Sequence, residues 1–196
     1  MKEEALLKAI NKYVQLTKKE NEFLLSKINT RKYSKGKYLV VQGDVCNYTS
    51  FIISGCTKTF HTDKKGNEHI VLFAEANWWC SDLGSFISKS PADYNIQCIE
   101  ATEVFEFSYA IREELCEKIP KLDRFFRKIL EKALVTSQKR IVRNLSLSAK
   151  ERYLLFCKEY PTIEQRVSQY MVASYLGITK EFLSKLKKEL IYKNEG

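Results

Sequence analysis

Five side chains that can contact nucleic acid lie in one short segment near the carboxyl end of the 196-residue chain. They are Lys180, Glu181, Ser184, Lys185 and Lys188, and this spacing places them on one face of a helix. Lysine ammonium groups bind phosphates, and lysine and glutamate side chains can also read base edges in the major groove. A basic helical face is often only solvated surface, so this pattern alone favours neither interpretation.

The distribution of charge along the chain favours nucleic-acid binding. The chain has 33 Lys and Arg residues against 24 Asp and Glu residues, which gives a net charge of +9. The part from Lys139 onward has a net charge of +6, so less than a third of the chain holds two thirds of the excess. Localised positive charge favours phosphate binding because the release of counterions drives association.

The elements that would position this face are two helices joined by a tight turn. Ser168 is placed to cap the first helix, Gly177 suits the left-handed residue that ends it, and Thr179 is placed to cap the second. The apolar residues expected to form the buried side of the pair are Val172, Leu176, Ile178, Leu183, Leu186 and Leu190. This spacing matches a helix-turn-helix, whose second helix enters the major groove of DNA.

The expected DNA-binding residues are Ser168, Gln169, Thr179, Lys180, Glu181, Ser184, Lys185 and Lys188. Phe182 could touch a thymine methyl group, but packing within the domain is the expected role of this ring.

A long helix is predicted upstream of this segment. Apolar residues recur with alternating spacings of four and three, and Pro120 suits the first turn of the helix. The seam expected to meet a second copy of the chain consists of Leu122, Phe126, Ile129, Ala133 and Thr136. A second apolar stripe contains Leu130, Leu134, Ile141 and Leu145. A helix with two apolar faces needs two partners, although burial of a single helix within one subunit remains an alternative.

The first half of the chain has the pattern of a compact antiparallel sheet structure. Glycines separate short β-prone runs, which are residues 38–41, 50–53, 57–61, 69–73, 96–99 and 104–107. Residues 63–67 are expected to form a polar hairpin turn with Gly66 in a left-handed conformation. The stretch from Glu3 to Ile28 is expected to be helical.

Nearly the whole chain resembles transcription regulators of the Crp/Fnr type, the cyclic-AMP receptor protein superfamily. The resemblance lies in the segments Tyr33–Gly36, Val41–Asp44 and Phe51–Gly55, and more specifically in Ala173–Lys185. It implies an α+β fold with an N-terminal antiparallel β-roll sensor domain at 1–119, a dimerisation helix and hinge at 120–146, and a helix-turn-helix domain at 147–196. The implied partners are double-stranded DNA with a palindromic promoter site, a second copy in a homodimer, RNA polymerase and an unidentified small-molecule effector.

Two departures from the family pattern affect these expectations. The base-reading positions of the family fall on Lys180, Glu181 and Lys185, where members often have arginine in place of the two lysines. Arginine reads guanine with a two-pronged fork and lysine does not, so weaker base discrimination or a different site is expected. Cyclic-nucleotide binders also carry a Gly-Glu pair and a nearby arginine that neutralises the phosphate, whereas residues 78–89 contain neither. A response to cyclic AMP is therefore not expected.

A pocket for another effector could be lined by Trp78, Trp79 and Phe86. Packing of these aromatic rings in the core is the alternative.

Other function classes find little support in the sequence. The six cysteines have no C-x-x-C spacing and are expected to be free thiols, so no metal site or cofactor is predicted. There are two histidines and no catalytic motif, and an enzyme is not expected. No apolar run approaches the ~20 residues that span a membrane, and a cytoplasmic location is expected. The competing hypothesis is a small-ligand-binding sensor module whose helix-turn-helix serves protein–protein interaction, and such a module would not bind DNA in a salt-dependent way.

Overall fold

The N-terminal helices of the protein form a pair rather than one continuous helix. The computed structural model describes residues 2–194 of the chain and side chains as far as residue 190. Its first two helices are α1 (Lys2–Asn11) and α2 (Lys18–Lys27). The single helical stretch expected from Glu3 to Ile28 is interrupted because Thr17 starts a new helix. The Thr17 side chain accepts from the backbone N–H of Glu20, and the Glu20 carboxylate accepts from the backbone N–H of Thr17.

Two four-stranded sheets follow, and their strands pair antiparallel, as the sequence predicts. One sheet has the order β1-β8-β3-β6 and the other the order β2-β7-β4-β5. The strands are β1 (Asn29–Tyr33), β2 (Tyr38–Val40), β3 (Tyr48–Ser54), β4 (Cys56–Thr62), β5 (Glu68–Glu75), β6 (Trp79–Cys80), β7 (Asn95–Cys98) and β8 (Thr102–Ser108). Six of them coincide with the predicted runs. The other two, β1 and β6, escaped prediction because β1 is mostly polar and exposed and β6 has only two residues.

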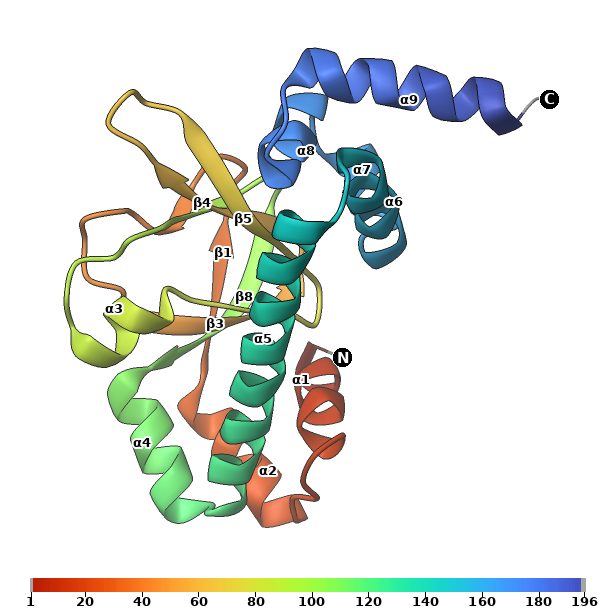
Figure 1. The fold of residues 1–196 in the computed structure, drawn as a ribbon. Coiled ribbons are helices and arrows are strands. Elements are labelled where there is room, and N and C mark those ends of the chain that lie inside the picture. Colours follow the sequence, from red (N-terminus) through yellow and green to blue (C-terminus); the bar gives the residue numbers. More distant parts are fainter. Residues whose placement is uncertain (1, 195–196) are drawn as a thin grey trace.

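The hairpin between β4 and β5 projects from one side of the molecule (Figure 1). Gly66 has a φ of +83°, and the Asp63 carboxylate accepts from the backbone N–H groups of Lys65 and Asn67. His61 and His69 are paired across the two strands, and the ring Nε2 of His69 lies 3.0 Å from the Asp63 carboxylate. The turn predicted at residues 63–67 is therefore confirmed.

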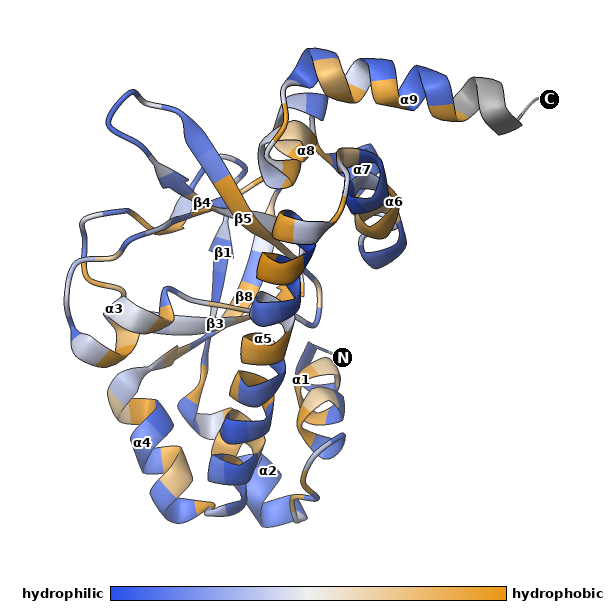
Figure 2. Ribbon diagram, viewed as in Figure 1, coloured by the Kyte–Doolittle hydropathy of each residue, from blue (hydrophilic) through white to orange (hydrophobic). Residues whose placement is uncertain are grey.

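The long helix α5 (Lys121–Ser146) connects the sheets to the C-terminal helices. It follows α3 (Leu83–Ser88) and α4 (Tyr109–Lys118), and Pro120 precedes its first turn. The first part of α5 packs Leu122, Phe125 and Phe126 into a core shared with α1 and β8. Its second part rises beyond that core, and Figure 2 shows apolar residues recurring along it.

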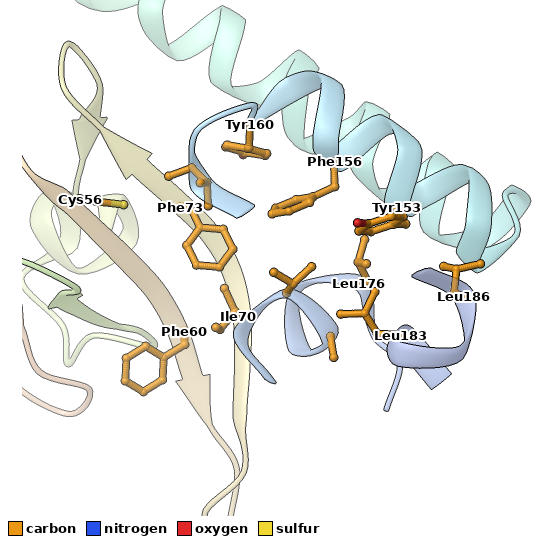
Figure 3. Packing of buried hydrophobic residues seen from close by; sticks show 13 residues of the cluster. Cys56, Phe60, Ile70, Phe73, Tyr153, Phe156, Tyr160, Leu176, Leu183 and Leu186 are labelled. Atoms are coloured by element: carbon orange, nitrogen blue, oxygen red, sulfur yellow. The ribbon is translucent and has the colours of Figure 1, made fainter. Parts of the chain in front are cut away.

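Four helices complete the described chain, and they are α6 (Ala149–Glu159), α7 (Ile163–Arg166), α8 (Gln169–Leu176) and α9 (Lys180–Asn194). Ser148 and Glu151 form a capping box at the start of α6. These helices share one hydrophobic cluster with β4 and β5 (Figure 3). Phe73 of β5 points toward Phe156 and Tyr160 of the C-terminal part, with ring centroids 6.2 and 6.3 Å apart. The boundaries expected at 119/120 and 146/147 stay a prediction.

Candidate nucleic-acid interface

The turn between α8 and α9 has the local structure that its residue types predict. Ser168 caps α8, since its hydroxyl accepts from the Met171 N–H at 3.3 Å. Gly177 ends α8 with a φ of +66°, which costs a residue with a Cβ more than it costs glycine. The Thr179 hydroxyl accepts from the Phe182 N–H at 3.1 Å at the start of α9.

A buried apolar wedge decides which face of α9 points outward. Leu183 and Leu186 are buried, and they lie in one cluster with Val172 and Leu176 of α8. Ala173 is also buried, which suits a small residue where two helices pack closely. The remaining predicted wedge residues, Ile178 and Leu190, pack against the same cluster. One side of α9 is therefore committed to the protein interior.

The opposite side of α9 carries the side chains expected to contact DNA. Lys180, Glu181, Lys185 and Lys188 are exposed, and Ser184 is half-buried between them. We name these five residues the lysine face. Ser168, Gln169 and Thr179 are also exposed. Figure 1 shows α9 standing clear of the two sheets at one end of the molecule.

Two exposed aromatic residues of the helix-turn-helix were not among the expected DNA contacts. Phe182 was expected to pack within the domain, but the side chain is 49% exposed. Tyr170, near the start of α8, is 50% exposed. Phe182 precedes the buried Leu183 by one position and follows Glu181 of the lysine face, so it lies where the two faces meet. That position is readable from helical spacing once the buried side is known.

The Glu164 carboxylate of α7 connects α9 to the neighbouring helices. Glu164 of α7 accepts from the Tyr153 hydroxyl at 2.5 Å and from the Lys187 ammonium at 2.7 Å. Partial burial acts to raise the pKa of Glu164, but the hydrogen bonds from Lys187 and Tyr153 outweigh it and the pKa lies below its usual value. Lys187 is thus occupied in holding α9, in contrast to the lysine face.

The three aromatic residues considered for an effector pocket lie in different places. Trp79 packs against Phe51, Phe107 and two phenylalanines of α5. Phe86 is fully buried in another cluster, and Trp78 is exposed beside Tyr160 with ring centroids 5.8 Å apart. The structure does not bring Trp78, Trp79 and Phe86 together, so that expectation is corrected. Trp79 and Phe86 instead pack in hydrophobic clusters, which was the alternative role for these rings.

Backbone amides around the start of α3 are already occupied by a carboxylate of the chain. Asp82 is only 4% exposed. Its carboxylate accepts from the N–H groups of Ser85 at 3.0 Å, Asp93 at 2.8 Å and Tyr94 at 3.1 Å. A phosphate would have to displace this internal anion to use the same donors. The arrangement agrees with the lack of a cyclic-nucleotide motif in residues 78–89.

The expected dimer seam on α5 is only partly available. Leu122 is fully buried in the chain's own core, Phe126 is 9% exposed, and Ile129 packs partly against the same core. Ala133 and Thr136 are exposed. The assignment of Leu122 and Phe126 to a subunit interface is therefore corrected, because tertiary packing against α1 and β8 takes that face.

The second stripe of α5 is exposed in the structure. Leu134 is 61% exposed and Leu145 is 84% exposed, with Leu130 and Ile141 on the same stripe. A groove lined by Leu83, Phe126, Leu130 and Leu134 runs beside its lower part.

All six cysteines are free. Burial raises the pKa of both Cys56 and Cys80 to about 12, so neither thiol forms a thiolate near neutral pH. Among the described residues, no group of histidine, cysteine and acidic side chains could hold a metal ion. Residues 2–194 also contain no helix long and apolar enough to cross a membrane.

Comparison with known proteins gives both sequence and fold relatives. Residues 30–118 match the cyclic nucleotide-binding domain family. The chain is 28% identical to the fumarate and nitrate reduction regulatory protein of Vibrio cholerae over 165 residues, which cover 78% of this chain and 64% of that protein. It is 25% identical to the transcriptional activator protein anr of Pseudomonas aeruginosa over 169 residues, covering 80% and 68%. The chain thus spans about two thirds of the length of these curated relatives.

Solved structures of regulators share the fold. The c-di-GMP responsive global regulator CLP of Xanthomonas campestris has a TM-score of 0.74 and 17% identity, covering 91% of this chain and 93% of that one. FixK2 of Bradyrhizobium japonicum has a TM-score of 0.74 and 15% identity, covering 85% and 86%. Residues 30–118 thus match a cyclic nucleotide-binding domain, and the chain as a whole is similar to regulators of the Crp/Fnr type.

Proposed function

We propose that the chain is a dimeric, sequence-specific DNA-binding transcription regulator that does not respond to cyclic AMP. The observation that carries this proposal is the lysine face of α9. Lys180, Lys185 and Lys188 are exposed there, while Leu183 and Leu186 hold the opposite side in the core. The curated relatives are named as a regulatory protein and a transcriptional activator, which supports the same function.

The charges and shape of this face suit the major groove. An α-helix fits the groove, where lysines contact phosphates or guanine edges and Glu181 can accept from cytosine N4. The exposed residues Ser168 and Gln169, at the N-terminal end of α8, are the proposed contacts to the DNA backbone. The half-exposed ring of Phe182 is available to a thymine methyl group.

A second copy of the chain is the proposed partner for the exposed stripe of α5. Leu130, Leu134, Ile141 and Leu145 expose apolar side chains along one helix, and a twin helix would bury them. A dimer would also present two copies of α9, as a palindromic site requires.

Salt dependence tests DNA binding most directly. In vitro selection with the purified chain is expected to recover a palindromic duplex, and the affinity for this duplex should fall steeply with salt. If each of two subunits neutralises three phosphates, log K against log [salt] has a slope of roughly −5. Failure to enrich any duplex, or binding that is insensitive to salt, contradicts the proposal and favours a sensor module with a protein partner.

The cyclic-AMP part of the proposal has its own test. Titration calorimetry of the chain with cyclic AMP is expected to show no binding heat, because Asp82 occupies the backbone amides of Ser85, Asp93 and Tyr94. Saturable micromolar binding would contradict it.

A further inference from the structure

The outer edge of β5 is covered by α8 through side-chain hydrogen bonds. β5 is the last strand of its sheet, so its outward backbone groups have no neighbouring strand. The Ser174 hydroxyl of α8 donates to the Glu68 carbonyl at 2.6 Å and accepts from the Ile70 N–H at 3.0 Å. One serine of the helix-turn-helix therefore replaces two hydrogen bonds that a further strand would make.

Arg140 of α5 joins the same strand to the same helix. One nitrogen of its guanidinium group donates to the Ile70 carbonyl at 3.1 Å and to the Tyr175 carbonyl at 3.2 Å. The guanidinium also lies 4.2 Å from the centroid of the Tyr175 ring. Arg140 thus bridges β5 and α8 from the long helix.

A second attachment lies at the other end of β5. Arg166 of α7 pairs with Glu75 at 3.0 Å and with Glu100 at 2.5 Å, and it donates to the Gly55 carbonyl at 3.2 Å. The Thr162 hydroxyl donates to Glu75 at 2.8 Å. The helix-turn-helix part is therefore held at both ends of one strand, which restricts its rotation about the end of α5.

Aromatic rings fill the space between the two attachments. Phe73 of β5 lies between the two parts, with ring centroids 5.6 Å from Tyr175 and 6.2 Å from Phe156. The Trp78 ring lies beside the Tyr160 ring, with the two planes tilted by 38°. Figure 3 shows that Phe73 faces the C-terminal helices rather than the inside of its own sheet pair.

The docking leaves the lysine face free. Ser174, Arg140 and Arg166 form hydrogen bonds or ion pairs with β5. Lys180, Lys185 and Lys188 are exposed. We propose that the β5 edge is a docking site that holds α9 in its DNA-binding orientation without a bound ligand, and that Ser174, Arg140 and Arg166 are its positioning residues. The affinity part of this inference rests on the proposed function, while the docking itself can be measured without DNA.

Docking at the β5 edge would strengthen DNA binding because it orients α9 before the DNA arrives. A dimer that reads two half-sites needs its two recognition helices at a fixed separation of about one helical turn of DNA. If undocking leaves about a tenth of the molecules in the competent orientation, the apparent affinity falls about tenfold.

The docking test uses Trp78 as an optical reporter in a Trp79→Phe parent of the full chain. Ser174→Ala combined with Arg166→Glu is expected to shift the Trp78 emission to longer wavelength and to speed amide exchange at Ile70. Far-UV circular dichroism checks that the sheets and helices remain. Arg124→Glu and Ser146→Ala, at exposed positions of α5, serve as matched controls and should change neither signal. Adding Glu100→Arg to Arg166→Glu should restore part of the parent emission by reversing the ion pair.

The same proteins are then titrated with the selected duplex. Undocked variants are expected to bind about tenfold more weakly than the parent, and the charge-reversed pair is expected to recover part of that loss. Unchanged emission and exchange in the Ser174/Arg166 variant would overturn the docking. If this variant undocks but binds the duplex as tightly as the parent or more tightly, the positioning role is overturned. Tighter binding would indicate that the contact with β5 inhibits DNA binding. If the parent binds no duplex, the proposed function is overturned. The Trp78 emission and the amide exchange at Ile70 would still test the docking, because neither measurement uses DNA.

Discussion

The Lys187 ammonium of α9, at a half-buried position of the helix, lies 2.7 Å from the Glu164 carboxylate of α7. This ion pair, together with the Tyr153 hydroxyl, ties the helix proposed to read DNA to the helices that support it. Both side chains are partly exposed, so solvent screens the pair and its contribution to stability is modest.

Glu164→Gln is expected to lower the free energy of unfolding by about 1 kcal/mol at neutral pH, because it replaces a charged acceptor with a neutral one. The pKa of Glu164 is lowered in the folded chain, so its stabilisation is present above the unfolded pKa and is lost as the pH falls through the folded value. The difference from the parent should therefore shrink as the pH is lowered from 7 to about 3. Urea unfolding at each pH measures it. Glu117→Gln, at an exposed position of α4, is the control, and a difference that grows in acid would contradict the assignment.

Lys185→Ala should weaken binding to the selected duplex by about 1–3 kcal/mol and reduce the steepness of the salt dependence, because an exposed cation of the lysine face is removed. Gel-shift titration at several salt concentrations measures both quantities. Lys19→Ala on α2 is the matched control, since Figure 1 places α2 at the end of the molecule opposite α9. Equal binding by Lys185→Ala and the parent would remove Lys185 from the DNA contact set.

Leu134→Asp should dissociate the proposed dimer while leaving the subunit folded, because the side chain is largely exposed in the single chain. A loss of about 2 kcal/mol of association free energy is expected for an apolar residue central to such an interface. Analytical ultracentrifugation measures the change. Leu154→Asp on α6 replaces another exposed leucine and should leave the association unchanged.

Phe126→Asp is expected to behave differently from Leu134→Asp. Phe126 packs against Trp79 and Phe125 in the chain's own core, so a charge there should unfold the chain rather than separate two folded subunits. Thermal unfolding followed by circular dichroism distinguishes the two results. A folded Phe126→Asp monomer would instead place this ring at the subunit interface.

Asp82→Ala should destabilise the chain by about 3 kcal/mol, since three backbone N–H groups lose their shared acceptor. Chemical denaturation measures the loss. Asp93→Ala removes a nearby exposed carboxyl group and serves as the control, which should remain close to the parent. If Asp82→Ala leaves the free energy of unfolding unchanged, the prediction is wrong and water replaces the carboxylate as the acceptor.

Some of the fold could be predicted from short-range patterns alone. The caps at Ser148, Ser168 and Thr179 and the left-handed Gly177 are hydrogen-bond and backbone features that involve residues within a few positions of one another. The wedge beneath α9 follows from helical spacing in the same way. For these reasons the helix-turn-helix and its outward lysine face were visible before any tertiary contact was known.

The surface that each apolar face contacts could be identified only from the tertiary structure. Both stripes of α5 are largely apolar, and only packing against α1 and β8 shows that Leu122 belongs to the core while Leu134 remains exposed. The contact of Ser174 with β5 joins residues 104 and 106 positions apart in the chain. The sequence by itself therefore determined the local elements and the exposed face of α9, because hydrogen bonds between near neighbours and helical periodicity decide them. The tertiary structure decided which surfaces meet, because burial depends on residues that are distant along the chain.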